Sequence, residues 1–145
     1  MDILPVASSF ERVTYSKLNG TQQEVVNFAK AAALLATYGF ECARVRADSL
    51  GADFLAHHML QGTVLPIQLK GRITIQKKYL KNKGLWIMCP VEGQWLLIPH
   101  VLLVSFVKKA TAGGLEDAKS WNIGGYRHMK KPSAKLFKMI EPWLV

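Results

Sequence analysis

Hydrophobic and polar residues alternate strictly over residues 67–76. The apolar positions are Ile67, Leu69, Ile73 and Ile75, with Gly71 between them, and the polar positions are Gln68, Lys70, Arg72, Thr74 and Gln76. Successive side chains of a β-strand point to opposite faces. The pattern therefore predicts one strand whose five polar side chains share a face.

A second strand is expected just before this one. The residues Leu60-Gln61-Gly62-Thr63 have the composition of a turn, and Asp53 precedes them by a strand's length. If the two strands pair in an antiparallel hairpin, Asp53 lies near Gln68 and Lys70. We therefore expect these three side chains to converge at one end of the hairpin.

A long helix is predicted upstream, from about Thr21 to Tyr38. Thr21 with Glu24 three residues later matches a capping box, and Gly39 is a typical helix stop. The helix is apolar around most of its circumference, which predicts that it is buried against a sheet. Glu24 lies on the buried side, in line with Phe28.

The remaining elements indicate an α/β fold with a mixed central sheet flanked by helices. Two apolar runs predict central or covered strands, and proline or serine marks the start of each later helix. The expected elements are a strand at Phe40–Val45, a turn at Ala47–Gly51, strands at Leu85–Pro90 and Gln94–Ile98, a helix at Pro99–Val107, a loop at Lys108–Tyr126 and a helix from Pro132 or Ser133 to Ile140. The length of 145 residues suits a single domain over residues 1–145.

The convergence of Asp53, Gln68 and Lys70 suits phosphodiester hydrolysis. Mg²⁺, or Mn²⁺ in its place, prefers oxygen ligands and retains several waters, so one carboxylate and one or two carbonyl oxygens can hold it. Asp53 offers the carboxylate, Gln68 its amide oxygen and Leu69 its backbone carbonyl. Lys70 is placed to position the attacking water or to stabilise developing charge.

These residues resemble the motif of the PD-(D/E)xK nuclease superfamily, which includes restriction endonucleases and Holliday-junction resolvases. The motif is an Asp, a hairpin, then an acidic residue, any residue and Lys; here Asp53 and Gln68-Leu69-Lys70 occupy those places. Ala52 replaces the usual Pro, and Gln68 replaces the acidic residue, which removes one negative charge from the metal site. The resemblance covers about residues 20–70 and implies a restriction-endonuclease-like core.

The resemblance also gives Glu24 a role. Resolvase-like nucleases carry Gly-x-x-x-Glu at the start of this helix, and that Glu reaches the metal, often through water; Gly20 and Glu24 have the same spacing. The alternative is that Glu24 only closes the capping box with Thr21. The two roles are compatible.

The net charge of +9 favours an acidic partner such as nucleic acid. Basic residues gather in two stretches, and we expect them to contact phosphates: Arg72, Lys77, Lys78, Lys81 and Lys83 in the first, Arg127, Lys130 and Lys131 in the second. The alternative for the first stretch is a solvated loop.

The sequence thus predicts a cytoplasmic Mg²⁺-dependent endonuclease acting on DNA, with RNA as a further candidate substrate. It shows no apolar run long enough to cross a membrane. One small domain leaves little room for a recognition module, so structure-specific or non-specific cutting is expected. Cutting both strands usually needs two sites, which favours a homodimer. The alternatives are a non-catalytic nucleic-acid-binding module and an interaction subunit on a degenerate nuclease fold.

Overall fold

A mixed five-stranded sheet is the centre of the structure, a computed structural model that describes residues 5–46, 51–115 and 118–145. The strands are β1 (Phe40–Arg44), β2 (Phe54–His58), β3 (Val64–Leu69), β5 (Trp86–Val91) and β6 (Gln94–Pro99), in the order β1-β2-β3-β5-β6. β3 and β5 are parallel, and the other neighbouring pairs are antiparallel. The predicted α/β class and the hairpin turn before residue 64 are confirmed.

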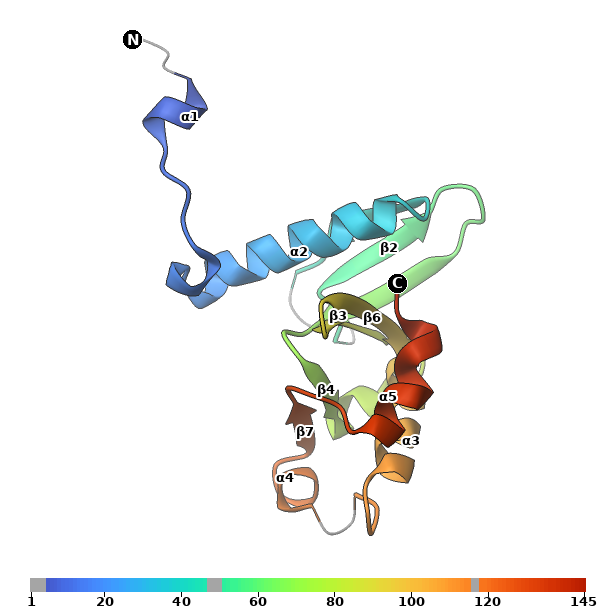
Figure 1. Ribbon diagram of the computed structural model, residues 1–145. Coiled ribbons are helices and arrows are strands. Elements are labelled where there is room, and N and C mark those ends of the chain that lie inside the picture. The colour runs from blue at the N-terminus through green and yellow to red at the C-terminus, as the bar shows by residue number, and fades with distance from the viewer. Residues whose placement is uncertain (1–4, 47–50, 116–117) are drawn as a thin grey trace.

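One face of the sheet is covered by α2 (Gly20–Ala36), which lies across β2 in Figure 1. Ala31 and Leu35 of the helix pack with Phe54, Ile67 and Met88 of the sheet, and all five side chains are buried. This is the buried helix that the apolar pattern predicts. Residues before it form the short α1 (Val6–Ser9) and the 3₁₀ turn η1 (Tyr15–Lys17), and α1 extends away from the sheet.

The cap of α2 differs from the predicted one. Asn19 is the N-cap, its side chain accepts a hydrogen bond from Gln22 N, and the Gln22 side chain accepts one from Asn19 N. The capping box is therefore Asn19 with Gln22, two residues earlier than predicted, because Asn is as good a cap as Thr. Glu24 takes no part in it. Gly39 ends the segment with φ of +89°, in the left-handed region where glycine is favoured.

The other face of the sheet packs against α3 (His100–Ala110) and α5 (Ala134–Ile140). Ile87, Cys89 and Ile98 of the sheet are buried against Leu103 and Ile140 of these helices. Because Met88 of β5 faces α2, this strand is covered on both faces, as its continuous apolar run predicts. The 3₁₀ turns η2 (Lys77–Lys81) and η3 (Glu141–Trp143) flank this core.

The prediction of one strand over residues 67–76 is wrong. β3 ends at Leu69, and β4 (Ile73–Gln76) pairs with β7 (Tyr126–Met129) in a separate two-stranded sheet. Ile67 packs in the core under α2, whereas Ile73 and Ile75 pack in the core under α3 and α5. The alternation continues through the break because each half has its own apolar side to bury, and periodicity alone cannot show that these are different cores. The five polar side chains therefore do not share one face.

The stretch expected to be a loop, Lys108–Tyr126, contains α4 (Lys119–Asn122), which buries Trp121. β7 begins at the last residue of that stretch and completes the second sheet with residues for which no element was predicted. β7 has only one aliphatic side chain in its sequence Tyr-Arg-His-Met, so it gives no alternating apolar signal. The predicted turn residues 47–50 lie outside the described residues. In the described part of the chain, no helix is long and apolar enough to span a membrane.

Candidate active site

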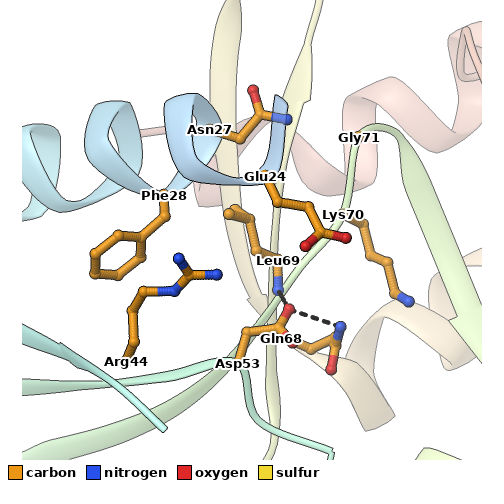
Figure 2. Close-up of a pocket in the computed structure, with 9 residues that line it drawn as sticks. All are labelled: Glu24, Asn27, Phe28, Arg44, Asp53, Gln68, Leu69, Lys70 and Gly71. Atoms are coloured by element: carbon orange, nitrogen blue, oxygen red, sulfur yellow. Dashed lines mark hydrogen bonds between the residues drawn. The ribbon is translucent and has the colours of Figure 1, made fainter. Parts of the chain in front are cut away.

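A cavity of about 320 Å³ lies where the first turns of α2 face the ends of β1 and β3 (Figure 2). It brings together residues from the helix, from β1, from the segment before β2 and from the end of β3. The lining residues are Glu24, Asn27, Phe28, Arg44, Asp53, Gln68, Leu69, Lys70 and Gly71. The prediction that Asp53, Gln68, Lys70 and Glu24 lie together is confirmed; their role in catalysis stays a prediction.

The hairpin register places Asp53 beside Gln68. Phe54 pairs with Ile67, so one step further Asp53 lies opposite Gln68, and Asp53 N donates a hydrogen bond to Ile67 O at 2.8 Å. Cross-strand partners carry their side chains on the same face. The turn at residues 60–63 and the spacing from Asp53 to Gln68 set this register.

Two hydrogen bonds hold the Asp53 carboxylate in place. Gln68 Nε2 donates to Asp53 Oδ2 at 2.7 Å, and Leu69 N donates to the same oxygen at 2.8 Å (Figure 2). Asp53 Oδ1 accepts no hydrogen bond within the described part of the chain. One carboxylate oxygen is therefore fixed, and the other has free lone pairs beside the cavity.

Partial burial has opposite effects on the two charged groups at the floor of the site. It raises the pKa of Asp53, and the nearby Glu24 raises it further, whereas the Leu69 N–H, Lys70 and Gln68 oppose the shift. Burial lowers the pKa of Lys70; Asp53 opposes this, and Lys78 adds to it. Both shifts arise because burial removes water from the charged form of each group and so disfavours it. A cation bound at Asp53 would offset the cost of keeping its carboxylate ionised.

Lys70 is held at the cavity edge by an aromatic contact. Its Nζ lies 5.5 Å from the ring centroid of Tyr79, and Lys78 Nζ lies 5.2 Å from the same centroid. Tyr79 is buried in η2, where its ring also packs edge-on against His100 at 5.5 Å. The Tyr79 ring thus connects the cavity to the basic stretch that follows it.

Glu24 is exposed on the second turn of α2 and lines the cavity. In Figure 2 its carboxylate points from the helix towards the side of the cavity that holds Gln68 and Lys70. Because Asn19 and Gln22 form the cap, the capping role considered for Glu24 is wrong. Its carboxylate is left available to the cavity.

Arg44 is a cavity residue that the sequence interpretation missed. Its guanidinium carbon lies 5.3 Å from the ring centroid of Phe28, and the guanidinium forms no hydrogen bond or ion pair with the described residues. Phe40 and Cys42 of the same strand pack under α2, so the period of two places Arg44 on that side as well. That alternation is the signal that could have identified it.

The oxygen donors at the cavity could hold a Mg²⁺ ion that keeps several of its waters, but they are too few to surround a metal with protein ligands alone. The described residues contain no cluster of three or more His, Cys, Asp or Glu side chains arranged to hold a metal. They do offer the open Asp53 oxygen, the Glu24 carboxylate and an amide, and Mg²⁺ commonly retains several waters. In the structure Gln68 turns its amide nitrogen towards Asp53, so ligation through its oxygen requires the amide to turn over.

The basic residues predicted to contact nucleic acid fall on two surfaces. Arg72, Lys77, Lys78, Lys81, Lys83 and Lys130 are exposed around the second sheet and η2. Arg127 and Lys131 instead line a separate hollow of about 350 Å³ between β7, α3 and α5. Lys77 Nζ lies 5.3 Å from the Trp121 ring, so this lysine also has a packing partner.

Comparison with known proteins identifies the fold. No family model and no curated protein matches the sequence. Among solved structures, the bacterial homing endonuclease I-Ssp6803I superposes with a TM-score of 0.50 at 13% sequence identity, over 86% of this chain and 88% of that one. The chain has a restriction-endonuclease-like fold. The predicted α/β fold class with a restriction-endonuclease-like core is thereby confirmed.

Proposed function

We propose that this protein is a Mg²⁺-dependent endonuclease that hydrolyses phosphodiester bonds of DNA. The observation that carries the proposal is the cavity in which a partly desolvated Asp53, held through one oxygen, lies with Gln68, Lys70 and Glu24. A desolvated carboxylate with an open oxygen is unfavourable unless a cation or a proton joins it. The fold adds support, because it is shared with an endonuclease.

The oxygen donors of the cavity have defined roles in this proposal. Asp53 would hold the ion through its open carboxylate oxygen, while the Leu69 N–H keeps the carboxylate oriented through Oδ2. Gln68, the Leu69 carbonyl and Glu24 would supply the further oxygen ligands, Glu24 directly or through water. When bound, Mg²⁺ would neutralise phosphate charge and make water a better nucleophile.

Two positively charged side chains, Lys70 and Arg44, act on the substrate in this proposal. Lys70, which occupies the lysine place of the motif, positions the attacking water or stabilises charge developing on the phosphate. Arg44 presents its guanidinium to a phosphate oxygen; a guanidinium can donate two parallel hydrogen bonds to phosphate. Its contact with Phe28 limits its freedom and so lowers the entropy lost on binding.

The direct test is cleavage of a panel of nucleic acids by the purified protein. Supercoiled, linear, single-stranded and branched DNA, and RNA, are incubated with Mg²⁺, with Mn²⁺ or with EDTA. We expect cleavage of at least one DNA form with either metal and none in EDTA. Absence of cleavage for every substrate with both metals would contradict the proposal.

A non-catalytic binder remains as the second candidate function, since Gln68 gives the site one negative charge less than the usual motif. It predicts salt-sensitive DNA binding without cleavage in the same panel. An interaction subunit predicts neither binding nor cleavage. The panel, with a binding measurement in EDTA, separates the three.

The basic stretch that follows the cavity gives a prediction about binding. Lys77, Lys78, Lys81 and Lys83 are exposed, and we expect their joint replacement by Gln to weaken DNA binding. The variant would neutralise fewer phosphates and would therefore release fewer counterions from the DNA. If all four contact phosphates, the slope of log K against log salt becomes shallower by roughly 3 to 4. Fluorescence anisotropy in EDTA over a salt series measures both quantities.

The matched control removes the same charge elsewhere. Lys108, Lys109, Lys135 and Lys138 are exposed on α3 and α5, and their joint replacement by Gln is expected to change the slope much less. Equal effects of the two sets would mean that only net charge matters. No effect of the first set would make the stretch a solvated loop.

A further inference from the structure

The two-stranded sheet of β4 and β7 has one side that is exposed along β7, whereas on β4 the same side is buried at Thr74 (7% exposed) and half-buried at Gln76. Thr74 pairs with His128 and Gln76 pairs with Tyr126, so these four residues share one side of the ribbon. Ile73, Ile75 and Met129 lie on the other side and pack in the core under α3 and α5. Tyr126 is 42% exposed and His128 is also exposed, so the outward side is open at β7.

The outward side carries hydrogen-bonding groups that nothing nearby uses. The Gln76 amide, the Tyr126 hydroxyl and the His128 ring nitrogens form no hydrogen bond with the described residues. The Thr74 hydroxyl is different, because it donates to Arg72 O at 3.0 Å. Three residues are thus left with donors and acceptors directed away from the core.

These side chains are also held in place. The rings of Tyr126 and His128 stack with centroids 5.5 Å apart and planes 17° apart. A Cβ atom at Gly124 would lie 2.7 Å from the Tyr126 ring, so glycine is what allows the ring to lie against the backbone there. Groups fixed in this way lose little conformational entropy on binding a partner.

Positive charge surrounds the outward side and connects it to the cavity. Gln76, Lys77, Lys78 and Tyr126 line a hollow of about 270 Å³ at one end of the ribbon. Lys78 shares the Tyr79 ring with Lys70, so the hollow adjoins the candidate active site. Arg72 and Lys130 are exposed at the other end of the two strands. The charge complements that of a phosphate backbone passing the cavity.

We propose that the β4–β7 ribbon enters the major groove of duplex DNA next to the cleaved phosphate and reads base edges with Gln76, Tyr126 and His128. The major groove is about 12 Å wide and admits a two-stranded ribbon, and four residues of strand span roughly 13 Å. Gln and His side chains can donate to and accept from base edges, and the flanking lysines set the register on the phosphates. The proposal rests on DNA being the substrate. It replaces the sequence-based expectation that cutting has no sequence preference.

The test is selection of duplexes with a randomised central segment, carried out in EDTA so that no cutting occurs. Wild type is expected to enrich a short motif. His128→Ala, Gln76→Ala and Tyr126→Phe are each expected to lower the preference for the enriched duplex over a scrambled one by roughly 5- to 150-fold per lost base contact. Their affinity for the scrambled duplex should change little.

Two charge variants serve as controls. Lys77→Gln is expected to weaken binding to the enriched and scrambled duplexes by the same factor. Lys135→Gln removes an exposed charge from α5 and should leave both the affinity and the preference nearly unchanged. Thermal melting checks that each variant is folded; the substituted side chains are exposed or half-buried.

Three results would overturn the inference: no enriched motif with wild type, a motif retained in full by the ribbon variants, or tighter binding to single-stranded than to duplex DNA. The last would indicate that the stacked rings bind unpaired bases. Because the selection needs no catalysis, its failure leaves the nuclease proposal intact. If the protein cleaves DNA but the ribbon variants keep the full preference, only this inference fails. If the ribbon variants lose the preference but no DNA is cleaved, only the nuclease proposal fails.

Discussion

Asp53→Asn and Lys70→Ala are each expected to reduce cleavage by at least about 100- to 1,000-fold while leaving DNA affinity in EDTA nearly unchanged. Asp53 supplies the open carboxylate oxygen of the cavity, and Lys70 is the cation beside it. The exposed lysines that would bind phosphates lie outside the cavity. Single-turnover cleavage with saturating protein, together with anisotropy, separates the two effects.

Matched controls make this result specific. Lys78→Ala removes the other ammonium that contacts the Tyr79 ring without touching the cavity lining, and it should cost much less activity than Lys70→Ala. Glu41→Gln removes an exposed carboxylate from β1 and should have no effect. Equal losses for Lys70→Ala and Lys78→Ala would mean that Lys70 has no role of its own.

Asp53→Asn should also leave the protein as stable as wild type or make it more stable. The pKa of Asp53 is raised in the folded state, so its ionised form opposes folding. This penalty is absent below the ordinary carboxyl pKa of about 4 and grows as pH rises through the raised folded value. The gain from Asn is therefore expected at neutral pH and should vanish in acid, as urea unfolding at two pH values would show. A loss of stability at neutral pH would contradict the proposed cost of the charge.

Gln68→Glu is expected to make the free energy of unfolding depend strongly on Mg²⁺. Without metal, the new carboxylate lies beside Asp53, replaces a hydrogen-bond donor and repels a like charge. The loss should be about 1–3 kcal/mol in the free energy of unfolding at neutral pH, and it should shrink in acid as one carboxyl is protonated. Mg²⁺ should reverse the loss, because the added charged oxygen strengthens its binding.

A thermal-shift titration with Mg²⁺ measures this directly. At 100 times its dissociation constant a ligand adds about 2.7 kcal/mol, so a tighter site gives its full shift at lower metal concentration. Half-maximal cleavage should also need less Mg²⁺ in this variant. Gln61→Glu, a change of the same kind at the exposed hairpin turn, is the control and should not alter the metal response. Identical titrations for wild type and Gln68→Glu would exclude Gln68 from the metal site.

Local pattern determined most of the candidate site. The alternation that begins at Ile67, the turn at residues 60–63 and the spacing to Asp53 are short-range features, and strand pairing converts them into a fixed register. Asp53 therefore lies opposite Gln68 in the structure, as the sequence predicts. The apolar helix from residue 20 likewise buries one side against the sheet, as its composition predicts.

The tertiary structure decided the features of the site and the fold that depend on contacts between distant segments. Arg44 joins the cavity only because β1 ends under the first turns of α2, and Glu24 is available only because Asn19 and Gln22 supply the cap. The strand expected over residues 67–76 divides because its two halves bury their apolar sides in different cores. β7 forms because residues 126–129 meet β4, some fifty positions earlier in the chain. Periodicity records which side of a segment is apolar, whereas the partner that covers this side is set by contacts between distant segments.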